Sequence, residues 1–276
     1  MNVVDRLRPS EVIRWPNSPP DRAQRAKMDT PTNLARNLLR RSGFDVVRYP
    51  GKLRGPFDDM GTFLAGIESP MILDVGANVG QSVRRFKQRF PGAQINSFEP
   101  SPRSYAELMA NCSGLPNVKA WNCGMGSAKG QLPLLENAAS DMTSFLEPSA
   151  RAWGSVEKTT LVDVLTLDSF AAEHGIDRID ILKSDTQGFE FDVLSGARRL
   201  MAENRISLVY LEMIFSDMYK AMKPIDKVLG LLSENNFLPV NFYEPNFQGG
   251  LISWMDALFI NSNFYSKVTN RAGPSA

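Results

Sequence analysis

Residues 71–81 read MILDVGANVGQ, and this stretch decides the fold. An apolar run ends at Asp74 and Val75, the chain turns through Gly76 and Gly80, and a helical pattern begins directly afterwards. A turn between a buried strand and a helix brings backbone amides and a helix N-terminus close to a ligand. The stretch therefore predicts a strand, a ligand-binding turn and a helix.

The alternation of strand and helix patterns continues along the chain. It predicts an α/β fold in which helices cover a mostly parallel sheet. The last two strands are separated by a short turn near residues 248–250, so they are expected to be antiparallel neighbours. Strands are expected over residues 71–75, 93–98, 117–123, 179–185, 206–213, 237–243 and 255–261, and helices over 81–90, 102–112, 169–175 and 188–201.

Two short polar side chains are expected to cap helices. Ser101 precedes Pro102, which suits the first turn of a helix. Asp168 precedes the apolar pattern of residues 169–175 and is expected to cap that helix. The polar region between the two helices is expected to be partly extended.

The organisation of the chain changes near residue 70. Residues 1–69 are predicted to form a proline- and charge-rich arm with short cap helices near 33–43 and 57–67. Residues 70–262 hold the strand–helix alternation and form the main domain. Residues 263–276 are expected to be a loose tail.

Composition and charge narrow the classes of partner. The 276 residues are 43% hydrophobic and 22% charged, with a formal net charge of +1. Such a balance does not indicate nucleic acid or an anionic membrane as a partner. No uncharged apolar run is long enough to span a bilayer, and the first residues lack the apolar segment of a signal peptide, so the cytoplasm is the expected location. The sequence sets no oligomeric state.

The glycine turn and the next strand together indicate a cofactor. A dinucleotide fingerprint needs a middle glycine, and Asn78 stands in its place. Glu99 ends the second strand, where its carboxylate can accept hydrogen bonds from both hydroxyls of a ribose. Asp74 disfavours a pyrophosphate and suits a cation such as an ammonium or a sulfonium. S-adenosylmethionine carries all three groups. Alternatively, Asp74 braces the turn and Glu99 is a surface acid.

The third strand adds candidates for the adenine. Asn122 lies at its end, where its amide can hydrogen-bond the ring, and Gly124 permits a close approach. Because ligands of open parallel sheets lie beyond the carboxyl ends of the strands, both residues are expected to converge with Asp185 and Glu212. His174 lies at the opposite, amino end of a strand and is not expected to take part in catalysis.

Five segments, in this order and spacing, resemble the FkbM-like family of class I S-adenosylmethionine-dependent methyltransferases. The resemblance spans roughly residues 70–262. It implies a seven-stranded sheet with an antiparallel last strand, and methyl transfer most often to a hydroxyl of a sugar or secondary metabolite. The family usually shows D-x-E-G-x-E, from which Gln187 departs. The segments are ILDVGANVGQ, SFEPSPRSYAELMAN, LVDVLTLDSF, DILKSDTQGFEFDVLSGA and LVYLEM.

The candidates for catalysis lie at the carboxyl ends of the later strands, where ligands of open parallel sheets bind. Asp185 is the first candidate for the base that takes the proton of a hydroxyl acceptor, and its alternative role is to hold the cofactor or cap a helix. Glu190 either faces the site or caps its own helix. Glu212 joins Asp185 at the adjacent strand end, where the two carboxylates could instead bind magnesium.

Other classes of function make different demands. A nucleic-acid methyltransferase is expected to show a basic stripe and an aromatic–proline loop, both missing from DTQGFE, and a protein acceptor ranks with it. A nicotinamide-dependent oxidoreductase needs the missing glycine. A non-catalytic scaffold would not bind the cofactor. A small-molecule or glycan acceptor is therefore expected. The polar residues Asp141, Thr143 and Ser144 are candidates for acceptor contacts, or else form a solvated turn. Trp153, Tyr219, Tyr243 and Trp254 are candidates to stack on a sugar ring, although such aromatic residues also serve as core.

Overall fold

A computed structural model describes residues 55–271, and all of them belong to one compact unit that begins at Arg54. The arm and the helix expected over 33–43 lie outside the described residues. Helix α2 is part of the unit, because Met60 and Leu64 are buried in its core. The boundary expected at residue 70 therefore lies too late.

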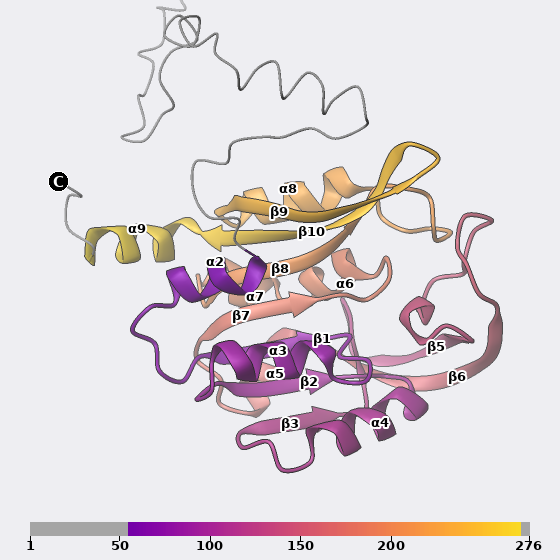
Figure 1. Cartoon of the computed structure of the whole chain (residues 1–276), viewed down its shortest axis with the longest axis horizontal. Helices are drawn as coiled ribbons and strands as arrows, with labels where there is room; N and C mark the ends of the chain where they lie inside the picture. The colour runs from indigo at the N-terminus through magenta and orange to yellow at the C-terminus, as the bar shows by residue number, and fades with distance from the viewer. Residues whose placement is uncertain (1–54, 272–276) are drawn as a thin grey trace, which may run out of the picture. The chain divides into compact units, whose positions relative to one another are not determined.

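A seven-stranded sheet forms the centre of the unit (Figure 1). Its strand order is β3-β2-β1-β7-β8-β10-β9, and every pairing is parallel except those of β10 with β8 and β9. The predicted mostly parallel sheet with an antiparallel last strand is confirmed. The strands are β1 Met71–Val75, β2 Gln94–Phe98, β3 Val118–Trp121, β7 Ile179–Ser184, β8 Ile206–Ile214, β9 Phe237–Gln248 and β10 Leu251–Asn261.

Helices cover both faces of this sheet because its strands alternate buried side chains between them. In β1, Ile72 packs with α2, α3 and α4, whereas Leu73 and Val75 pack on the face of α5 to α8. The helices are α2 Pro56–Phe63, α3 Gln81–Arg89, α4 Pro102–Cys112, α5 Leu167–Glu173, α6 Glu190–Ser195, α7 Arg198–Ala202, α8 Ile225–Glu234 and α9 Ser262–Arg271.

A second, three-stranded sheet of order β4-β6-β5 follows β3. The region expected to be partly extended thus forms strands of its own, because β5 and β6 pair with each other in antiparallel register. The short helix η2, Ser140–Met142, lies in the connection from β5 to β6. The strands are β4 Gly124–Met125, β5 Gly130–Asn137 and β6 Val156–Leu165.

Three local expectations need correction. Thr166 caps α5 by accepting from the Ser169 amide, while Asp168 instead accepts from the amides of Arg199 and Leu200 at the start of α7. The helix expected over 188–201 is divided into α6 and α7 at Gly196, where a Cβ would lie 2.1 Å from the Gly126 carbonyl oxygen. The tail expected from residue 263 is helical through α9.

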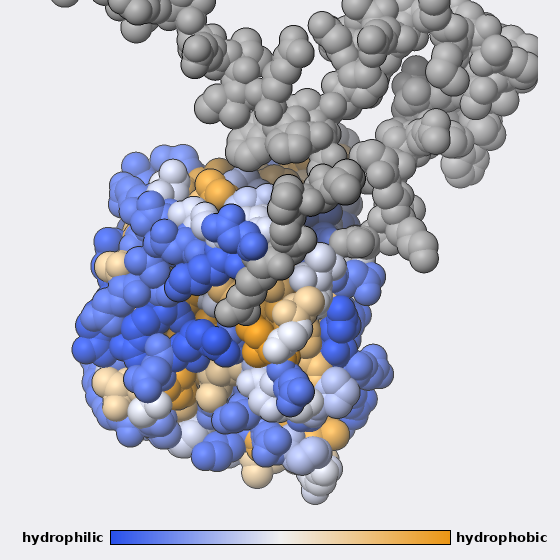
Figure 2. All heavy atoms as spheres, turned by 90° about the vertical axis from the view of Figure 1, so that its left-hand side faces the viewer, coloured by the Kyte–Doolittle hydropathy of each residue, from blue (hydrophilic) through white to orange (hydrophobic). Residues whose placement is uncertain are grey.

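The edge at the amino ends of the parallel strands faces the viewer in Figure 2 and is mostly hydrophilic, with apolar residues in smaller groups. His174 follows α5 toward this end and stacks on Phe170, as expected for a residue outside the site. Within residues 55–271 no helix combines the length and apolar character needed to cross a bilayer. The functional candidates gather at the opposite, carboxyl edge of the sheet.

Candidate functional site

Two cavities lie at the carboxyl edge, with volumes of about 230 and 310 Å³. They are called the first and second cavity here. They share five lining residues, Gly76, Asn78, Asp141, Asp185 and Glu212. A ligand that binds in one cavity can therefore reach the other across these residues.

The two cavities differ in chemical character. The first combines apolar and acidic residues, and the second is polar and contains two cations. The distinctive residues of the first are Phe98, Glu99, Gly124, Phe145, Trp153 and Trp254, and those of the second are Phe57, Ser82, Arg85, Lys183, Tyr210 and Asp256.

The two glycines of the turn are required by packing against the protein itself. Gly76 has φ +73°, and a Cβ there would lie 1.8 Å from the Asp185 carbonyl oxygen. Gly80 has φ +92°, and its Cβ would approach Leu108 of α4 to 3.0 Å. The turn therefore packs tightly against the residue after β7 and against α4, which leaves little room for a side chain at either glycine. Of these two turn glycines, both expected to bind cofactor, Gly76 lines both cavities and Gly80 lines neither.

Replacing Gly76 with alanine is expected to lower the free energy of unfolding by about 2 kcal/mol or more, because a left-handed conformation is combined with a backbone clash. Gly114 is a matched control, since it has φ +81° and nothing within 4 Å of its would-be Cβ. Gly114→Ala should cost only about 1 kcal/mol of conformational strain. Urea unfolding of both variants measures the difference, and equal losses would contradict the clash.

Asn78 is the residue of the turn that offers a side chain to both cavities. Its backbone has φ +46°, and its amide donates to Glu99 Oε2 at 2.8 Å. Its side-chain Nδ2 lies 3.4 Å from Ser140 Oγ, while its Oδ1 is buried and accepts no hydrogen bond from a described residue. Buried acceptors are normally satisfied. The vacant acceptor thus suits a hydrogen-bond donor on a ligand.

Glu99 is buried, with 6% of its surface exposed, so its interpretation as a surface acid is wrong. Its two oxygens accept from the backbone amides of Asn78 and Ser101, at 2.8 and 2.9 Å. Burial raises the pKa of the Glu99 carboxyl to about 7, although the two amide donors oppose the shift. Each carboxylate oxygen keeps a further lone pair for a hydroxyl of a ligand.

Asn122 and Gly124 take different positions around the first cavity. Asn122 Nδ2 donates to the carbonyl oxygens of Glu99 and Pro100, at 2.9 and 3.0 Å, and the residue lines neither cavity. Gly124 lines the first cavity beneath Phe145, whose ring leaves no space for a side chain. The structure therefore gives Asn122 a bracing contact and places Gly124 at the cavity wall.

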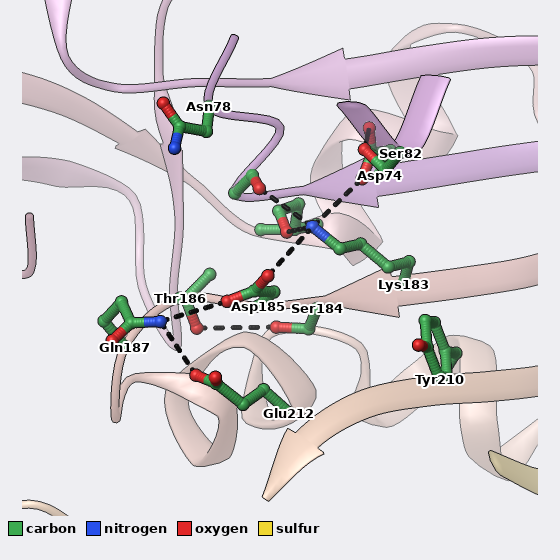
Figure 3. Close-up of polar contacts among 12 residues, drawn as sticks. Asp74, Asn78, Ser82, Lys183, Ser184, Asp185, Thr186, Gln187, Tyr210 and Glu212 are labelled. Carbon is green, nitrogen blue, oxygen red and sulfur yellow. Dashed lines mark hydrogen bonds and ion pairs between the residues drawn. The ribbon is translucent and has the colours of Figure 1, made fainter. Parts of the chain in front are cut away.

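Asp74 faces a lysine. It is fully buried, accepts from Ser82 Oγ at 2.7 Å and lies 3.3 Å from Lys183 Nζ (Figure 3). Lys183 Nζ also donates to the Gly76 carbonyl at 2.8 Å and lies 3.6 Å from Asp185. Burial opposes the charge, but the two carboxylates raise the pKa of Lys183 overall. The cation beside Asp74 is thus Lys183, and Asp74 lines neither cavity.

A glutamine joins the two carboxylates at the ends of β7 and β8. Gln187 Nε2 donates to Asp185 at 3.2 Å and to Glu212 at 2.8 Å, as Figure 3 shows. Its Oε1 accepts from the Tyr219 hydroxyl at 2.7 Å, and its backbone carbonyl accepts from Ser144. Gln187 has φ +55°, a conformation that persists where surrounding contacts enforce it. These contacts hold both carboxylates at the junction of the cavities.

Electrostatics separates the roles of these acids. Burial, followed by the charges of Asp185 and Glu190, raises the pKa of Glu212 well above its usual value. Burial and these neighbouring charges therefore favour the protonated form of the Glu212 carboxyl. The side chain of Asp185 is 43% exposed and faces both cavities. Both carboxyl groups line the two cavities, and the Asp185 side chain is the one with a large exposed fraction.

Glu190 braces the turn that carries Gln187. Its carboxylate accepts from the Thr186 amide at 2.7 Å and from the Thr186 hydroxyl at 3.0 Å. Burial raises its pKa to about 7. Glu190 lines neither of the two cavities, so of the two roles left open, its contacts agree with the bracing of its own helix start.

The second cavity contains three residues that the sequence did not single out. Tyr210 donates to Asp256 across β8 and β10, and Arg85 of α3 makes no ion pair with a described residue. Asp256 lies directly opposite Glu212 in the strand register, a relation that needs the sheet order to be known. Among residues 55–271, no three His, Cys, Asp or Glu side chains are placed to hold a metal ion together.

The fold and this edge define a class of protein. A seven-stranded sheet with one antiparallel strand, a glycine turn after β1 and a buried acid after β2 are the features of class I S-adenosylmethionine-dependent methyltransferases. The model of the methyltransferase FkbM domain matches residues 74–239. The chain belongs to this family.

Named relatives agree with the assignment. The chain is 29% identical over 174 residues to the 2-O-methyltransferase NoeI of Sinorhizobium fredii, covering 59% of this chain and 71% of the relative. It is 33% identical over 156 residues to the methyltransferase sdnD of Sordaria araneosa, covering 46% of this chain and 60% of the relative. The chain thus spans about three-fifths to seven-tenths of these relatives. Family membership decides against a nicotinamide-dependent oxidoreductase.

Solved structures show only a distant likeness. Fibrillarin of Aeropyrum pernix in complex with S-adenosyl-L-methionine gives a TM-score of 0.42 at 10% identity, over 70% of this chain and 67% of that protein. A Burkholderia thailandensis 1,6-didemethyltoxoflavin-N1-methyltransferase gives 0.41 at 13% identity, over 74% and 77%. At such TM-scores neither structure informs the roles of residues here.

Proposed function

We propose that the protein transfers a methyl group from S-adenosylmethionine to a hydroxyl of a small molecule or glycan, with Asp185 as the base. The observation that carries this proposal is the accessible Asp185 carboxylate, held by Gln187 and Lys183 where the two cavities meet. The relative named as a 2-O-methyltransferase supports an oxygen acceptor.

The residues present fit the cofactor. The first cavity offers Glu99 to the ribose hydroxyls and the wall of Gly124 and Phe145 to the adenine. The vacant Asn78 Oδ1 suits a donor near the junction. The second cavity offers the Arg85 guanidinium to the carboxylate of the methionine end. When bound, the cofactor supplies an electrophilic methyl carbon.

Charge in the first cavity restricts the acceptor. Four carboxyl side chains line it, those of Glu99, Asp141, Asp185 and Glu212, and no lysine, arginine or histidine is among its described lining residues. Phosphate contacts in proteins depend on basic side chains and helix N-termini. A nucleic acid or a phosphorylated acceptor is therefore disfavoured, and a neutral acceptor fits.

The same charges favour oxygen over nitrogen. An amine among these carboxyl groups would be stabilised as an ammonium, which has no lone pair to accept a methyl group. A hydroxyl keeps its lone pairs and needs only a nearby proton acceptor. The carboxylate of Asp185 meets this need.

The chain's residues then have defined tasks in the reaction. Gln187 and Lys183 orient the Asp185 carboxylate, and Gln187 also donates to the neighbouring Glu212. Asp185 would take the proton of the acceptor hydroxyl. The bound cofactor would supply the methyl carbon to which the hydroxyl oxygen bonds, and its sulfur would keep the electron pair of the broken carbon–sulfur bond. The products are a methyl ether, S-adenosylhomocysteine and a proton. Holding the two reactants aligned supplies much of the rate.

Calorimetric titration with S-adenosylhomocysteine tests the cofactor assignment. Saturable binding is expected, and Glu99→Ala should weaken it by about 1.5–3 kcal/mol, the typical loss for hydrogen bonds to a charged group. Glu173→Ala is a control of the same type at an exposed position outside both cavities, and it should bind as the wild type does. No binding by folded wild-type protein would contradict the proposal and favour a scaffold.

Cofactor affinity is also expected to depend on pH through Glu99. Its carboxyl has a pKa near 7 without ligand, and only the ionised form accepts both ribose hydroxyls. Lowering the pH from about 8 to about 6 should therefore weaken binding of S-adenosylhomocysteine about tenfold. The same titrations with Glu99→Ala should show a much smaller change, and an equal change in both proteins would assign the effect elsewhere.

A further inference from the structure

Two tryptophans lie together in the wall of the first cavity. The ring centroids of Trp153 and Trp254 are 5.4 Å apart, with an angle of 40° between the planes. Both line the cavity, and Trp153 is 39% exposed. Large aromatic side chains contribute much of their free energy through burial, and a group of them left partly exposed in a cavity is typical of a binding surface. The pair is called the tryptophan platform here.

The platform is placed beyond the sheet by an overhang of two strands. Ser184, the last residue of β7, pairs with Leu211 of β8, whereas Trp254 pairs with Ile214 three residues further on. Three residues of strand extend about 10 Å. Trp254 therefore lies beyond the carboxyl end of β7, which Asp185 directly follows. Trp153 reaches the same place from the connection between η2 and β6.

The first cavity can be divided into a portion for the cofactor and a portion for the acceptor. Glu99, Gly124 and Phe145 form the portion assigned to the nucleoside of the cofactor. The platform lies with Ile214 and Met218 in the remaining portion, which also includes the polar residues of η2. Asp141 of η2 lines both cavities and makes no hydrogen bond or ion pair with a described residue. An acceptor in this portion meets an aromatic surface and unused acceptor oxygens.

We propose that the tryptophan platform binds the ring of a neutral carbohydrate and presents one of its hydroxyls to Asp185. This proposal rests on the proposed methyl transfer and names its substrate class. A sugar ring has an apolar C–H face that packs on indole rings, and an edge of several hydroxyl donors. Asp141 and Asp185 are available to accept from that edge. A planar phenol could stack on the two indole rings, but its single hydroxyl would leave most of these carboxyl oxygens without a hydrogen-bond donor, which costs free energy in a cavity.

Saturation-transfer NMR on the full chain loaded with S-adenosylhomocysteine tests the proposal. The probes are millimolar methyl α-glycosides of glucose, galactose and mannose, with catechol and benzylamine as rival ligands. We expect transfer to the ring protons of at least one glycoside. Trp153→Ala should weaken its binding about three- to tenfold, the range for loss of an aromatic contact, and Trp153→Phe should recover part of it.

Leu161→Ala is the matched control, because Leu161 is 63% exposed and lines neither cavity. It should bind glycosides as the wild type does, and all three variants should bind S-adenosylhomocysteine normally. Cofactor binding without transfer to any glycoside, a preference for catechol or benzylamine, or an unchanged affinity in Trp153→Ala would each overturn the carbohydrate platform and leave methyl transfer intact. Loss of cofactor binding in the wild type would instead overturn the proposed function.

Discussion

Asp185→Asn is expected to slow methyl transfer about 10²- to 10⁴-fold, the usual contribution of a positioned general base. Asparagine has nearly the same shape, and its carbonyl oxygen can still accept from Gln187 Nε2, which lies 3.2 Å from the Asp185 carboxylate. It cannot take the proton of the acceptor. Binding of S-adenosylhomocysteine should therefore change little, while the rate constant falls.

The measurement is the rate of S-adenosylhomocysteine release with a hydroxylated acceptor that the wild type methylates. Asp192→Asn is the control, because Asp192 lies in α6 close by, accepts from Ser127 and lines neither cavity. It should keep wild-type activity. A rate for Asp185→Asn within about threefold of wild type would exclude Asp185 as the base and leave positioning of the reactants as the main source of catalysis.

The sheet and the start of the site could be predicted because their determinants are local. MILDVGANVGQ places an apolar strand, a left-handed glycine and a helix within one short segment. Glu99 follows the next strand directly, and parallel strands bring their carboxyl ends to one edge. The three-stranded sheet could be predicted only as a partly extended region, since β5 and β6 each begin with four exposed residues and show no apolar alternation there.

The orientation of polar side chains could not be read in the same way. Asp74 was expected to face a cationic ligand, and the cation that it meets is Lys183 from a distant part of the chain. The side-chain amide of Asn122 donates both of its hydrogen bonds to backbone carbonyls. Asp74 does bind a cation and Asn122 does donate hydrogen bonds, as the sequence indicated. Which groups they contact depends on strand order and register, which local sequence does not give.

The contacts of Gln187 illustrate the same limit of local reasoning. In the sequence this residue is a departure from the family pattern. In the fold its amide nitrogen donates to Asp185 and Glu212, and the hydroxyl of Tyr219, 32 residues away, donates to the oxygen of the same amide. A glutamate in its place would bring a third acid to the pair. The glutamine supplies two donors instead, one to each carboxyl group, beside the Lys183 ammonium that lies 3.6 Å from Asp185.

Asp74→Asn is expected to lower the free energy of unfolding by about 3–5 kcal/mol, the cost of leaving a buried charge without its partner. Lys183 is only 6% exposed, and the carboxylate of Asp74 lies 3.3 Å from its ammonium. The neighbouring carboxylate of Asp185 is at 3.6 Å but is 43% exposed, so solvent screens it more strongly. Urea unfolding of the variant measures the loss.

The double variant Asp74→Asn/Lys183→Met separates the ion pair from the hydrogen bonds of Asp74. Removing both charges also removes the unpaired ammonium, so the double variant should be more stable than Asp74→Asn alone. It would still lack the strong acceptor for Ser82 and the donor to the Gly76 carbonyl, and so should not reach wild-type stability. If the double variant were less stable than Asp74→Asn, the buried charge would not be the cause of the loss. The acid after β1 would then act mainly through Ser82, as an anchor for the first turn of α3.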